Sequence, residues 1–360
     1  LRRGSMYLAL TDEQQFLIEA ATDALGRRAT LPAAREALDG APYASLWDVA
    51  VEAGWTGLLV DEDAGGAGLS AYEAMLVLEE CGRRLADARL LGHLPATALL
   101  QEAGFDADLR ASLASGERRA ALVAGPGPHV DVDGADVLVV VGEDGTASVV
   151  EATAPGVTIT PCDGYDATRA LADVSLEGVS GERLDLAPER VRDGADLQRA
   201  LLAAESVGAA DACLAMAREH AIDRQAFGRA IGSYQAIKHK LVEMLRRVEG
   251  ARSLLVHAGR TWTQHRHQFA LAANAARVSA CEALDYAAPE NIFIHGGVGA
   301  TWEHDCSLYY RRAELSRRLC GGAEAAAETV AEQLFASPQL AAHYRDEGHA
   351  GAWAAPEVVG

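Results

Sequence analysis

Two motifs in the C-terminal half of the sequence combine residue types that suit a ligand with phosphate groups and flat rings. They are Arg224-Gln225-Ala226-Phe227-Gly228 and His295-Gly296-Gly297-Val298-Gly299. A guanidinium such as Arg224 can bind phosphate oxygens in pairs, and its charge does not titrate away. Phe227 offers a flat apolar face to a ring. Gly296 and Gly297 lack Cβ, so their backbone N–H groups can approach a ligand closely. Together the motifs predict a dinucleotide-binding site.

Each motif alone has a plainer interpretation. Arg224 alone is typical of a solvated helix residue, Phe227 of a core side chain, and the Gly296-Gly297 pair of a turn between helices. The second motif also lacks the preceding strand of a βαβ dinucleotide-binding unit. Only the joint occurrence of the motifs favours the binding site.

The charge balance excludes several classes of partner. The 360 residues include 32 Lys+Arg and 52 Asp+Glu, which gives a formal net charge of -20. This charge repels nucleic acid and anionic membrane surfaces, and we expect no apolar window near the ~20 residues of a membrane span. The six cysteines are widely spaced, which predicts reduced thiols and no metal site. We therefore expect a cytoplasmic protein with neither nucleic-acid nor membrane partners.

The N-terminal third of the chain has helical periodicity. Residues 1–5 precede Met6 and are interpreted as an expression scar. Thr11 and Gln14 have the spacing of a capping box at the start of a helix. Apolar residues then recur at three- and four-residue spacing, namely Phe16, Leu17, Ala20, Ala21 and Leu25. The pattern predicts an N-terminal helical domain over 6–118.

The hydrophobic pattern changes in the middle of the chain, and helical periodicity returns after it. Short apolar runs separated by Gly-containing turns predict strands at 137–141, 147–150 and 157–159. They place a small β domain at 119–188 and a C-terminal helical bundle at 189–340, followed by an irregular tail at 341–360. In the bundle a long apolar stripe is expected on one helix, formed by Ile237, Leu241, Met244, Leu245, Val248, Ala251 and Leu255.

This order of domains, with both motifs, resembles the acyl-CoA dehydrogenase family over nearly the whole chain. Residues 61–70 are similar to the family's N-terminal loop, 221–235 to its most recognisable signature, and 294–305 to its C-terminal signature. The resemblance implies an α+β, mostly α fold with an N-terminal helical domain, an abbreviated middle β domain and a C-terminal four-helix-bundle-like domain. It also implies flavin-dependent α,β-dehydrogenation of an acyl-CoA thioester, with FAD as cofactor.

The resemblance further implies which residues bind cofactor and substrate. In the family, the signature residues reach the adenosine half of the flavin across a subunit interface, which implies an oligomer. The cofactor-binding positions are then Arg224, Phe227, Tyr234, Gln235, Phe293, Gly296 and Gly297. Phe293 stands where a Gln is usual. Asp196 and Arg199 match positions near the acyl-CoA thioester and its nucleotide, and an exposed helix pair is the alternative.

The chain departs from the family at the catalytic base, which is a glutamate in one of two positions. One position lies about 23 residues after Gly297 and falls on Cys320, followed by Gly321. The other lies about 26 residues before Arg224 and falls on Gln198. No catalytic residue is therefore assigned.

Other groups could in principle replace the missing glutamate. A Cys320 thiolate is an alternative base if Arg317 and Arg318 lower its pKa. The remaining carboxylates to consider are Glu205, Glu303, Glu314 and Glu324, which we interpret as structural.

The part of the family's flavin site that lies in the middle domain is also missing. A Thr-Glu-Pro-x-x-Gly-Ser-type loop normally contacts the isoalloxazine, whereas residues 122–130 here read Leu-Val-Ala-Gly-Pro-Gly-Pro-His-Val. These losses resemble the shorter subunits of actinobacterial heteromeric α2β2 acyl-CoA dehydrogenases, which often act on bulky thioesters such as steroid side-chain fragments.

Three hypotheses follow for function. In the first, this chain is a non-catalytic or flavin-sharing subunit, and a longer homologous subunit supplies the base and most of the FAD site. In the second, it is a self-sufficient homo-oligomeric acyl-CoA dehydrogenase with a relocated carboxylate. In the third, it is a flavin-free scaffold or binding protein that keeps the fold.

Overall fold

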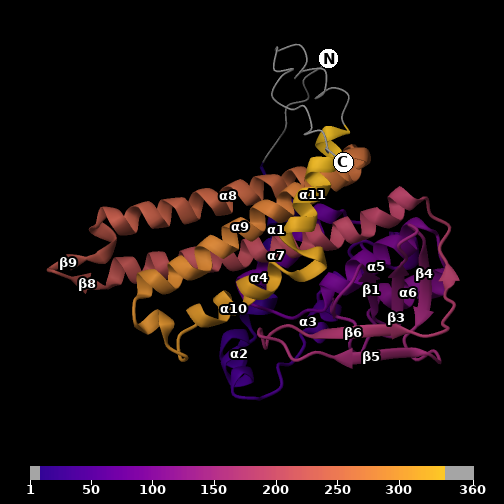
Figure 1. The fold of residues 1–360 in the computed structure, drawn as a ribbon, viewed down its shortest axis with the longest axis horizontal. Helices are drawn as coiled ribbons and strands as arrows, with labels where there is room; N and C mark the ends of the chain where they lie inside the picture. Colours follow the sequence, from indigo (N-terminus) through magenta and orange to yellow (C-terminus); the bar gives the residue numbers. More distant parts are fainter. Residues whose placement is uncertain (1–8, 337–360) are drawn as a thin grey trace, which may run out of the picture.

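The structure is a computed structural model and describes residues 9–336. Figure 1 shows an elongated molecule in which long helices extend to one side and two small sheets lie at the other. The interpreted scar at 1–5 and the expected irregular tail at 341–360 lie outside the described residues.

The N-terminal part is helical. Its elements are α1 (Asp12–Gly26), α2 (Thr30–Leu38), α3 (Trp47–Glu52), η1 (Trp55–Gly57), η2 (Glu62–Ala64), α4 (Ala71–Arg83), α5 (Leu90–Glu102) and α6 (Ala107–Ala114). The predicted capping box is confirmed, because the Gln14 N–H donates to Thr11 Oγ1 at 3.2 Å and the Thr11 N–H donates to Gln14 Oε1 at 3.0 Å. Phe16 is 72% exposed, since α1 buries only a narrow face that carries Ala21 and Leu25.

Two small sheets follow. The first has the order β1 (Ala120–Ala124), β3 (Val137–Val141), β4 (Ala147–Glu151), β7 (Glu182–Arg183), and the second β2 (His129–Val130), β6 (Leu171–Leu176), β5 (Val157–Pro161). The three predicted strands are confirmed as β3, β4 and β5. One face of the first sheet packs on α5 and α6, and its other face packs on the second sheet. Alternating side chains along β1 and β3 thus fill two separate cores.

The C-terminal part is built on three long helices. They are α7 (Pro188–Asp223), α8 (Gln235–Gln264) and α9 (Phe269–His295), and they run side by side in Figure 1. A hairpin of β8 (Gln225–Ala226) and β9 (Arg229–Ala230), with η3 (Ile231–Ser233), joins α7 to α8 at the free end. The remaining elements are η4 (Arg266–Gln268), η5 (Val298–Ala300), α10 (Cys306–Ser316), η6 (Leu319–Gly321) and α11 (Gly322–Phe335).

The expected apolar stripe lies on α8 with one exception. Met244, Val248, Ala251 and Leu255 are buried, whereas Leu245 is 48% exposed because it lies off the packed face. The fold class predicted from the sequence, mostly α with small sheets, is confirmed.

Helix α7 corrects one expectation from the sequence. It contains an 18-residue window that is apolar enough to cross a membrane, although no such window was expected. Most of this window is buried inside the fold. The apolar side chains therefore serve the core, and this helix is weak evidence for a membrane span.

Two glycines set the crossing of α4 and α7. A Cβ added to Gly208 of α7 would lie 1.8 Å from the Glu79 carbonyl oxygen, and one added to Gly82 of α4 would lie 1.9 Å from the Glu205 carbonyl oxygen. Each value is far inside van der Waals contact, so the two backbones touch where these residues meet. The close approach buries the middle of α7 under the N-terminal helices.

We predict that Gly208→Ala lowers the free energy of unfolding by about 3 kcal/mol or more, because the backbones must move apart. Gly250→Ala on α8 is the matched control, since nothing lies within 4 Å of its added Cβ. This control should stabilise the chain by ~0.5–1 kcal/mol. Urea unfolding followed by circular dichroism measures both. Similar stabilities for the two variants would contradict the close crossing.

Candidate cofactor and substrate sites

The predicted cofactor residues lie at the free end of the helical bundle. Arg224 follows the last residue of α7, and Phe227 and Gly228 form the turn of the β8–β9 hairpin. Both turn residues have positive φ, 53° and 80°, as a two-residue hairpin turn requires. Phe227 is 97% exposed, so it is not a core residue. A bulky side chain held in the left-handed region and open to solvent is typical of a contact site.

Tyr234 braces this hairpin. Its hydroxyl donates to the Ala226 carbonyl at 3.0 Å, and the Arg229 guanidinium lies 4.0 Å from its ring centre. Gln235, the first residue of α8, is exposed beside it. Tyr234 therefore positions the hairpin through contacts within this chain, while Gln235 remains open to a ligand.

The second motif lies at the same end. Phe293 is 60% exposed near the end of α9, and the Lys240 ammonium of α8 lies 4.3 Å from its ring centre. Gly296 ends α9 with φ 67° and ψ −141°. Nothing lies within 4 Å of a Cβ built on Gly296 or Gly297, so both backbones face open space.

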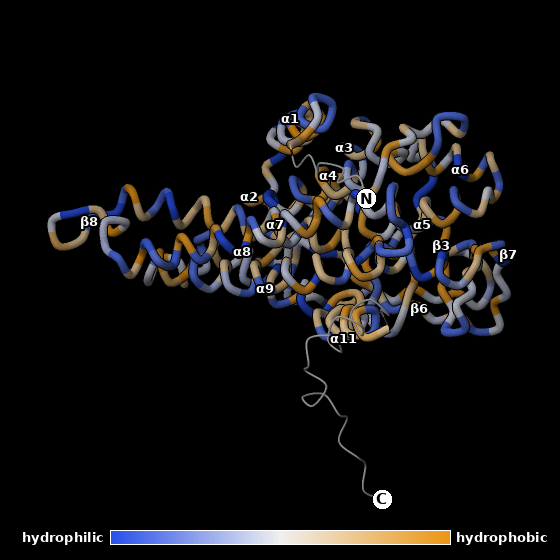
Figure 2. Tube along the Cα trace, turned by 90° about the horizontal axis from the view of Figure 1, so that it is seen from above, coloured by the Kyte–Doolittle hydropathy of each residue, from blue (hydrophilic) through white to orange (hydrophobic). Residues whose placement is uncertain are grey.

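Hairpin and second motif are thus brought together at one end of the bundle. The His220 ring of α7 lies 4.2 Å from the His295 ring, which joins the end of α7 to the end of α9. Figure 2 shows the same end standing clear of the rest of the molecule. An exposed guanidinium, an exposed aromatic ring and an open glycine backbone fit the pyrophosphate and adenosine half of FAD. The isoalloxazine half has no matching loop between β1 and β2.

The two positions where the family carries its base also meet. The Cys320 thiol lies 3.5 Å from Gln198 Oε1, and Gln198 Nε2 donates to the Leu91 carbonyl at 3.1 Å. Cys320 has φ 56° and ψ 40° within η6, a left-handed backbone that is uncommon for a residue with a side chain. Cys320 and Gln198 therefore lie in contact although they are far apart in the sequence. Neither of them is a carboxylate.

The surroundings of Cys320 do not favour the thiolate alternative. Burial raises the pKa of the Cys320 thiol above its ordinary value, and the arginines that oppose this shift are Arg277, Arg199 and Arg169. Arg317 and Arg318, which were expected to lower it, are not among its main charged neighbours. Burial therefore makes Cys320 a less readily ionised thiol than an exposed one.

Asp196 and Arg199 lie next to this position and are not an exposed pair. Asp196 is 5% exposed. Its carboxylate accepts hydrogen bonds from Arg199 Nη1 at 3.2 Å and from Asn274 Nδ2 at 2.7 Å. Arg199 Nε also donates to the Cys320 carbonyl at 3.1 Å. The arginine therefore holds the strained Cys320 backbone in place.

One helix separates the two groups of residues. Gln198 and Arg224 are about 26 positions apart on α7, or roughly 39 Å at 1.5 Å per residue. The hairpin of this chain therefore cannot meet a ligand group that sits at Cys320 of the same chain.

Glu205 is part of a buried network of ion pairs. Its carboxylate pairs with Arg169, and its other oxygen lies 3.2 Å from Arg312 Nη1. Arg312 Nε also donates to Asp166 at 2.5 Å. All four side chains are almost fully buried. Although burial alone would raise the pKa of Asp166, the Arg312 guanidinium holds it below its ordinary value.

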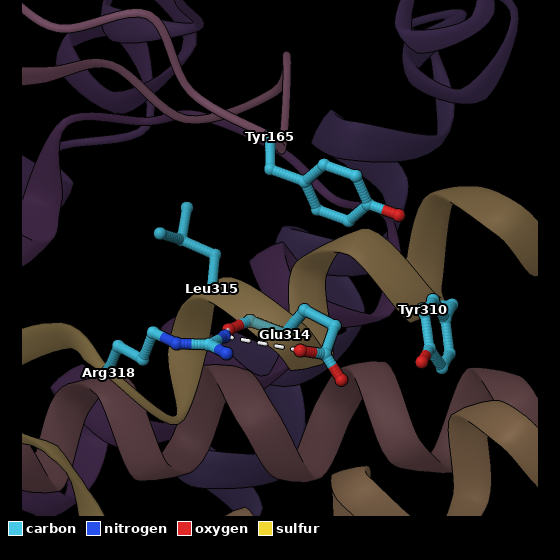
Figure 3. A pocket seen from close by; sticks show the side chains of 5 residues that line it. All are labelled: Tyr165, Tyr310, Glu314, Leu315 and Arg318. Carbon is cyan, nitrogen blue, oxygen red and sulfur yellow. Dashed lines mark hydrogen bonds and ion pairs between the residues drawn. The ribbon is translucent and has the colours of Figure 1, made fainter.

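The other candidate carboxylates are also occupied or exposed. Glu303 and Glu324 are exposed. Glu314 pairs with Arg317 at 2.9 Å and with Arg318 at 3.2 Å. Figure 3 shows its side chain in a cleft of about 470 Å³ that is lined by Tyr165, Tyr310, Glu314, Leu315 and Arg318.

The interior beside Cys320 holds further buried charge. Asp87 is 2% exposed and lies 3.0 Å from Arg89 Nε. Burial, together with the nearby Asp131 carboxylate, raises the pKa of Asp87 to about 6. Asp131 is also fully buried and accepts the Gly92 N–H at 2.9 Å. Charged side chains thus fill this part of the interior.

A cluster that the sequence analysis did not predict lies beside the second motif. One ligand atom from each of His295, His304 and Cys306 lies within 4.8 Å of the other two. The three residues fall within one short stretch of sequence, but the turn of η5 is needed to bring them together. The close spacing of two histidines and a cysteine was the only available signal.

Two family models match most of the described chain. The family described as "Acyl-CoA dehydrogenase, N-terminal domain" matches residues 11–107, and "Acyl-CoA dehydrogenase, C-terminal domain" matches residues 189–335. Acyl-CoA dehydrogenase IpdE2 of Mycobacterium tuberculosis is 35% identical over 331 residues, which cover 91% of this chain and 99% of that protein.

Two solved structures illustrate the likeness in three dimensions. A variant of the Tcur3481-Tcur3483 steroid ACAD has a TM-score of 0.81 at 25% identity, covering 94% of this chain and 99% of that one. The ChsE4-ChsE5 complex from Mycobacterium tuberculosis also has a TM-score of 0.81, at 22% identity, covering 92% and 99%. The second likeness concerns the fold alone.

We predict that Glu205→Ala lowers the free energy of unfolding by about 3–5 kcal/mol, because the buried Arg169 guanidinium loses its carboxylate partner and Arg312 loses one of its two. Glu219→Ala, an exposed position on the same helix, should change it by less than about 0.5 kcal/mol. Chemical denaturation measures the difference. Equal stability of both variants would show that the network contributes little.

We further predict that Asp87 makes the fold more stable as the pH falls from 7 towards 4. A carboxyl whose pKa is raised in the folded state binds a proton there before it does so in the unfolded chain. The stability it costs at neutral pH is recovered below about pH 6. Asp87→Asn should remove this component from a plot of unfolding free energy against pH. An unchanged plot would contradict the assignment.

Proposed function

The chain belongs to the acyl-CoA dehydrogenase family, and from this premise we propose that it is one subunit of a flavin-dependent oxidoreductase whose partner supplies the base. The observation that carries the proposal is the separation along α7. The exposed Arg224 and Phe227 lie roughly 39 Å from Gln198 and Cys320. A chain with a cofactor-binding end and no base at its other end is expected to complete a site in another subunit.

In this proposal the hairpin end of the chain binds FAD, whose ring lies in the partner. Arg224 would bind the pyrophosphate through paired N–H donors, and the open backbone of Gly296 and Gly297 would lie against the adenosine half. Phe227 and Phe293 offer exposed aromatic faces at the same end. When bound, FAD supplies the acceptor for the hydride that leaves the β carbon of the acyl-CoA.

The partner is proposed to be a longer homologous acyl-CoA dehydrogenase subunit in an α2β2 assembly in the cytoplasm. It would contribute the carboxylate that removes the α proton, because Cys320 and Gln198 cannot. The Tcur3481-Tcur3483 steroid ACAD, which is 25% identical to this chain, carries the names of two components. This likeness supports such a pairing. It also supports a bulky substrate such as a steroid side-chain CoA thioester.

The buried charges beside Cys320 support a structural role for that end. The Arg169–Glu205–Arg312–Asp166 network and Asp87 occupy the interior. Removal of a proton from an acyl-CoA needs a free carboxylate in a desolvated pocket. Here the buried carboxylates are instead fixed by arginines or hydrogen bonds.

Co-expression with the longer homologue tests the proposal. We expect the chain alone to be colourless and inactive, and the complex to be yellow and to oxidise an acyl-CoA with an artificial electron acceptor. Arg224→Ala in this chain should lower the flavin content and activity of the complex at least about tenfold, since a charge-assisted contact is lost. Arg218→Ala, exposed on the same helix, should leave both unchanged.

Two further variants separate the hypotheses. Cys320→Ser and Glu205→Gln should leave the kcat of the folded complex within about twofold if the partner supplies the base. A yellow, active chain without a partner would favour the self-sufficient enzyme, and loss of activity on changing Glu205 would identify the base. A chain that stays colourless with or without its partner would favour the scaffold.

A further inference from the structure

Three metal-ligating side chains meet where α9 turns into α10. His295 is the last residue of α9, His304 lies in the following turn, and Cys306 is the first residue of α10. The His295 and His304 ring centres are 4.5 Å apart, and Cys306 Sγ lies 3.5 Å from His295 Nδ1. Imidazole nitrogen and thiolate sulfur are the ligands that zinc takes in proteins.

We propose that His295, His304 and Cys306 bind a divalent transition metal ion of the Zn²⁺ class. Ligand atoms at about 2.0–2.3 Å from a tetrahedral ion stand roughly 3.3–3.8 Å from one another. The ligand atoms here, all within 4.8 Å of one another, need only small side-chain movements to reach that spacing. Three protein ligands leave a fourth position for water or for His220, whose ring centre lies 4.2 Å from that of His295.

The hydrogen bonds of the two histidines are compatible with metal binding. His295 Nδ1 donates to the Asn291 carbonyl at 2.9 Å, and this bond holds the imidazole ring in place. A ligating histidine commonly donates its other ring N–H to a backbone carbonyl in this way. His304 Nδ1 accepts the Cys306 N–H at 3.3 Å, a long bond whose loss costs little.

Burial favours an ordered site that solvent can still reach. Cys306 is fully buried and His295 is 9% exposed, whereas His304 is half-buried. The Asp305 carboxylate adds negative charge next to the ligands and pairs with Arg35 at 3.1 Å.

A bound ion would join the end of α9 to the start of α10. The chain between them carries Gly296 and Gly297, whose backbone has no side chain to hold it. The metal would therefore fix the shape of this turn. The site itself stands on its three ligands and does not depend on the proposed role of the turn in cofactor binding.

Titration with Co²⁺ tests the site. The full-length chain is treated with a chelator, freed of it, and titrated with CoCl₂. We expect about one equivalent per chain, with a thiolate-to-cobalt charge-transfer band and the visible bands of a tetrahedral ion. Cys306→Ser should abolish the charge-transfer band, and His304→Ala should weaken binding at least about tenfold. Cys162→Ser, a cysteine far away in the β region, is the matched control.

Metal binding by the wild-type chain tests the proposal without relying on a variant that folds poorly. Zn²⁺ should displace Co²⁺ from the wild-type chain, erase the spectrum and raise the Tm. Absence of stoichiometric binding by the wild-type chain would overturn the proposal. So would a charge-transfer band that persists in a folded Cys306→Ser variant, because the ion would then be bound elsewhere.

Discussion

The arrangement of the candidate sites depends on one rigid element, helix α7. A continuous helix of 36 residues sets a fixed distance between the end that carries Arg224 and the position of Gln198. The helix is held in the molecule by the close crossing with α4 at Gly82 and Gly208, where a side chain would collide with backbone. Because neither end can move towards the other, the two groups of candidate positions stay far apart within one chain.

The middle of the same helix carries a buried carboxylate, Glu205, that belongs to a network of ion pairs. The Glu205 backbone forms one of the two glycine contacts, with Gly82, and its side chain pairs with Arg169 from the β region and Arg312 from α10. One side chain therefore ties together three parts of the chain. Removal of a partner from such a network is costly, whereas the network itself adds little net stability over apolar packing. Its value lies in fixing how the helices and sheets meet.

Local signals in the sequence predicted much of the fold. The Thr11 capping box and the strand at Val137–Val141 depend on neighbouring residues, and both were found as expected. The exposure of Phe16 was not foreseen, because helical spacing does not tell which face is covered. The contact between Cys320 and Gln198 joins positions 122 residues apart and needs the register of packed helices. The partners of Glu205 were missed for the same reason, whereas the His295 cluster depends on the local turn at η5.

The central claim is that this chain contributes half of a flavin site to another subunit. A structure of the assembly with FAD and an acyl-CoA ligand tests it most directly. We expect the Arg224 guanidinium to lie within hydrogen-bond distance of the flavin pyrophosphate. The flavin ring and the carboxylate nearest the substrate α carbon should both lie in the partner. A flavin ring beside Cys320, with a carboxylate of this chain at the α carbon, would contradict it.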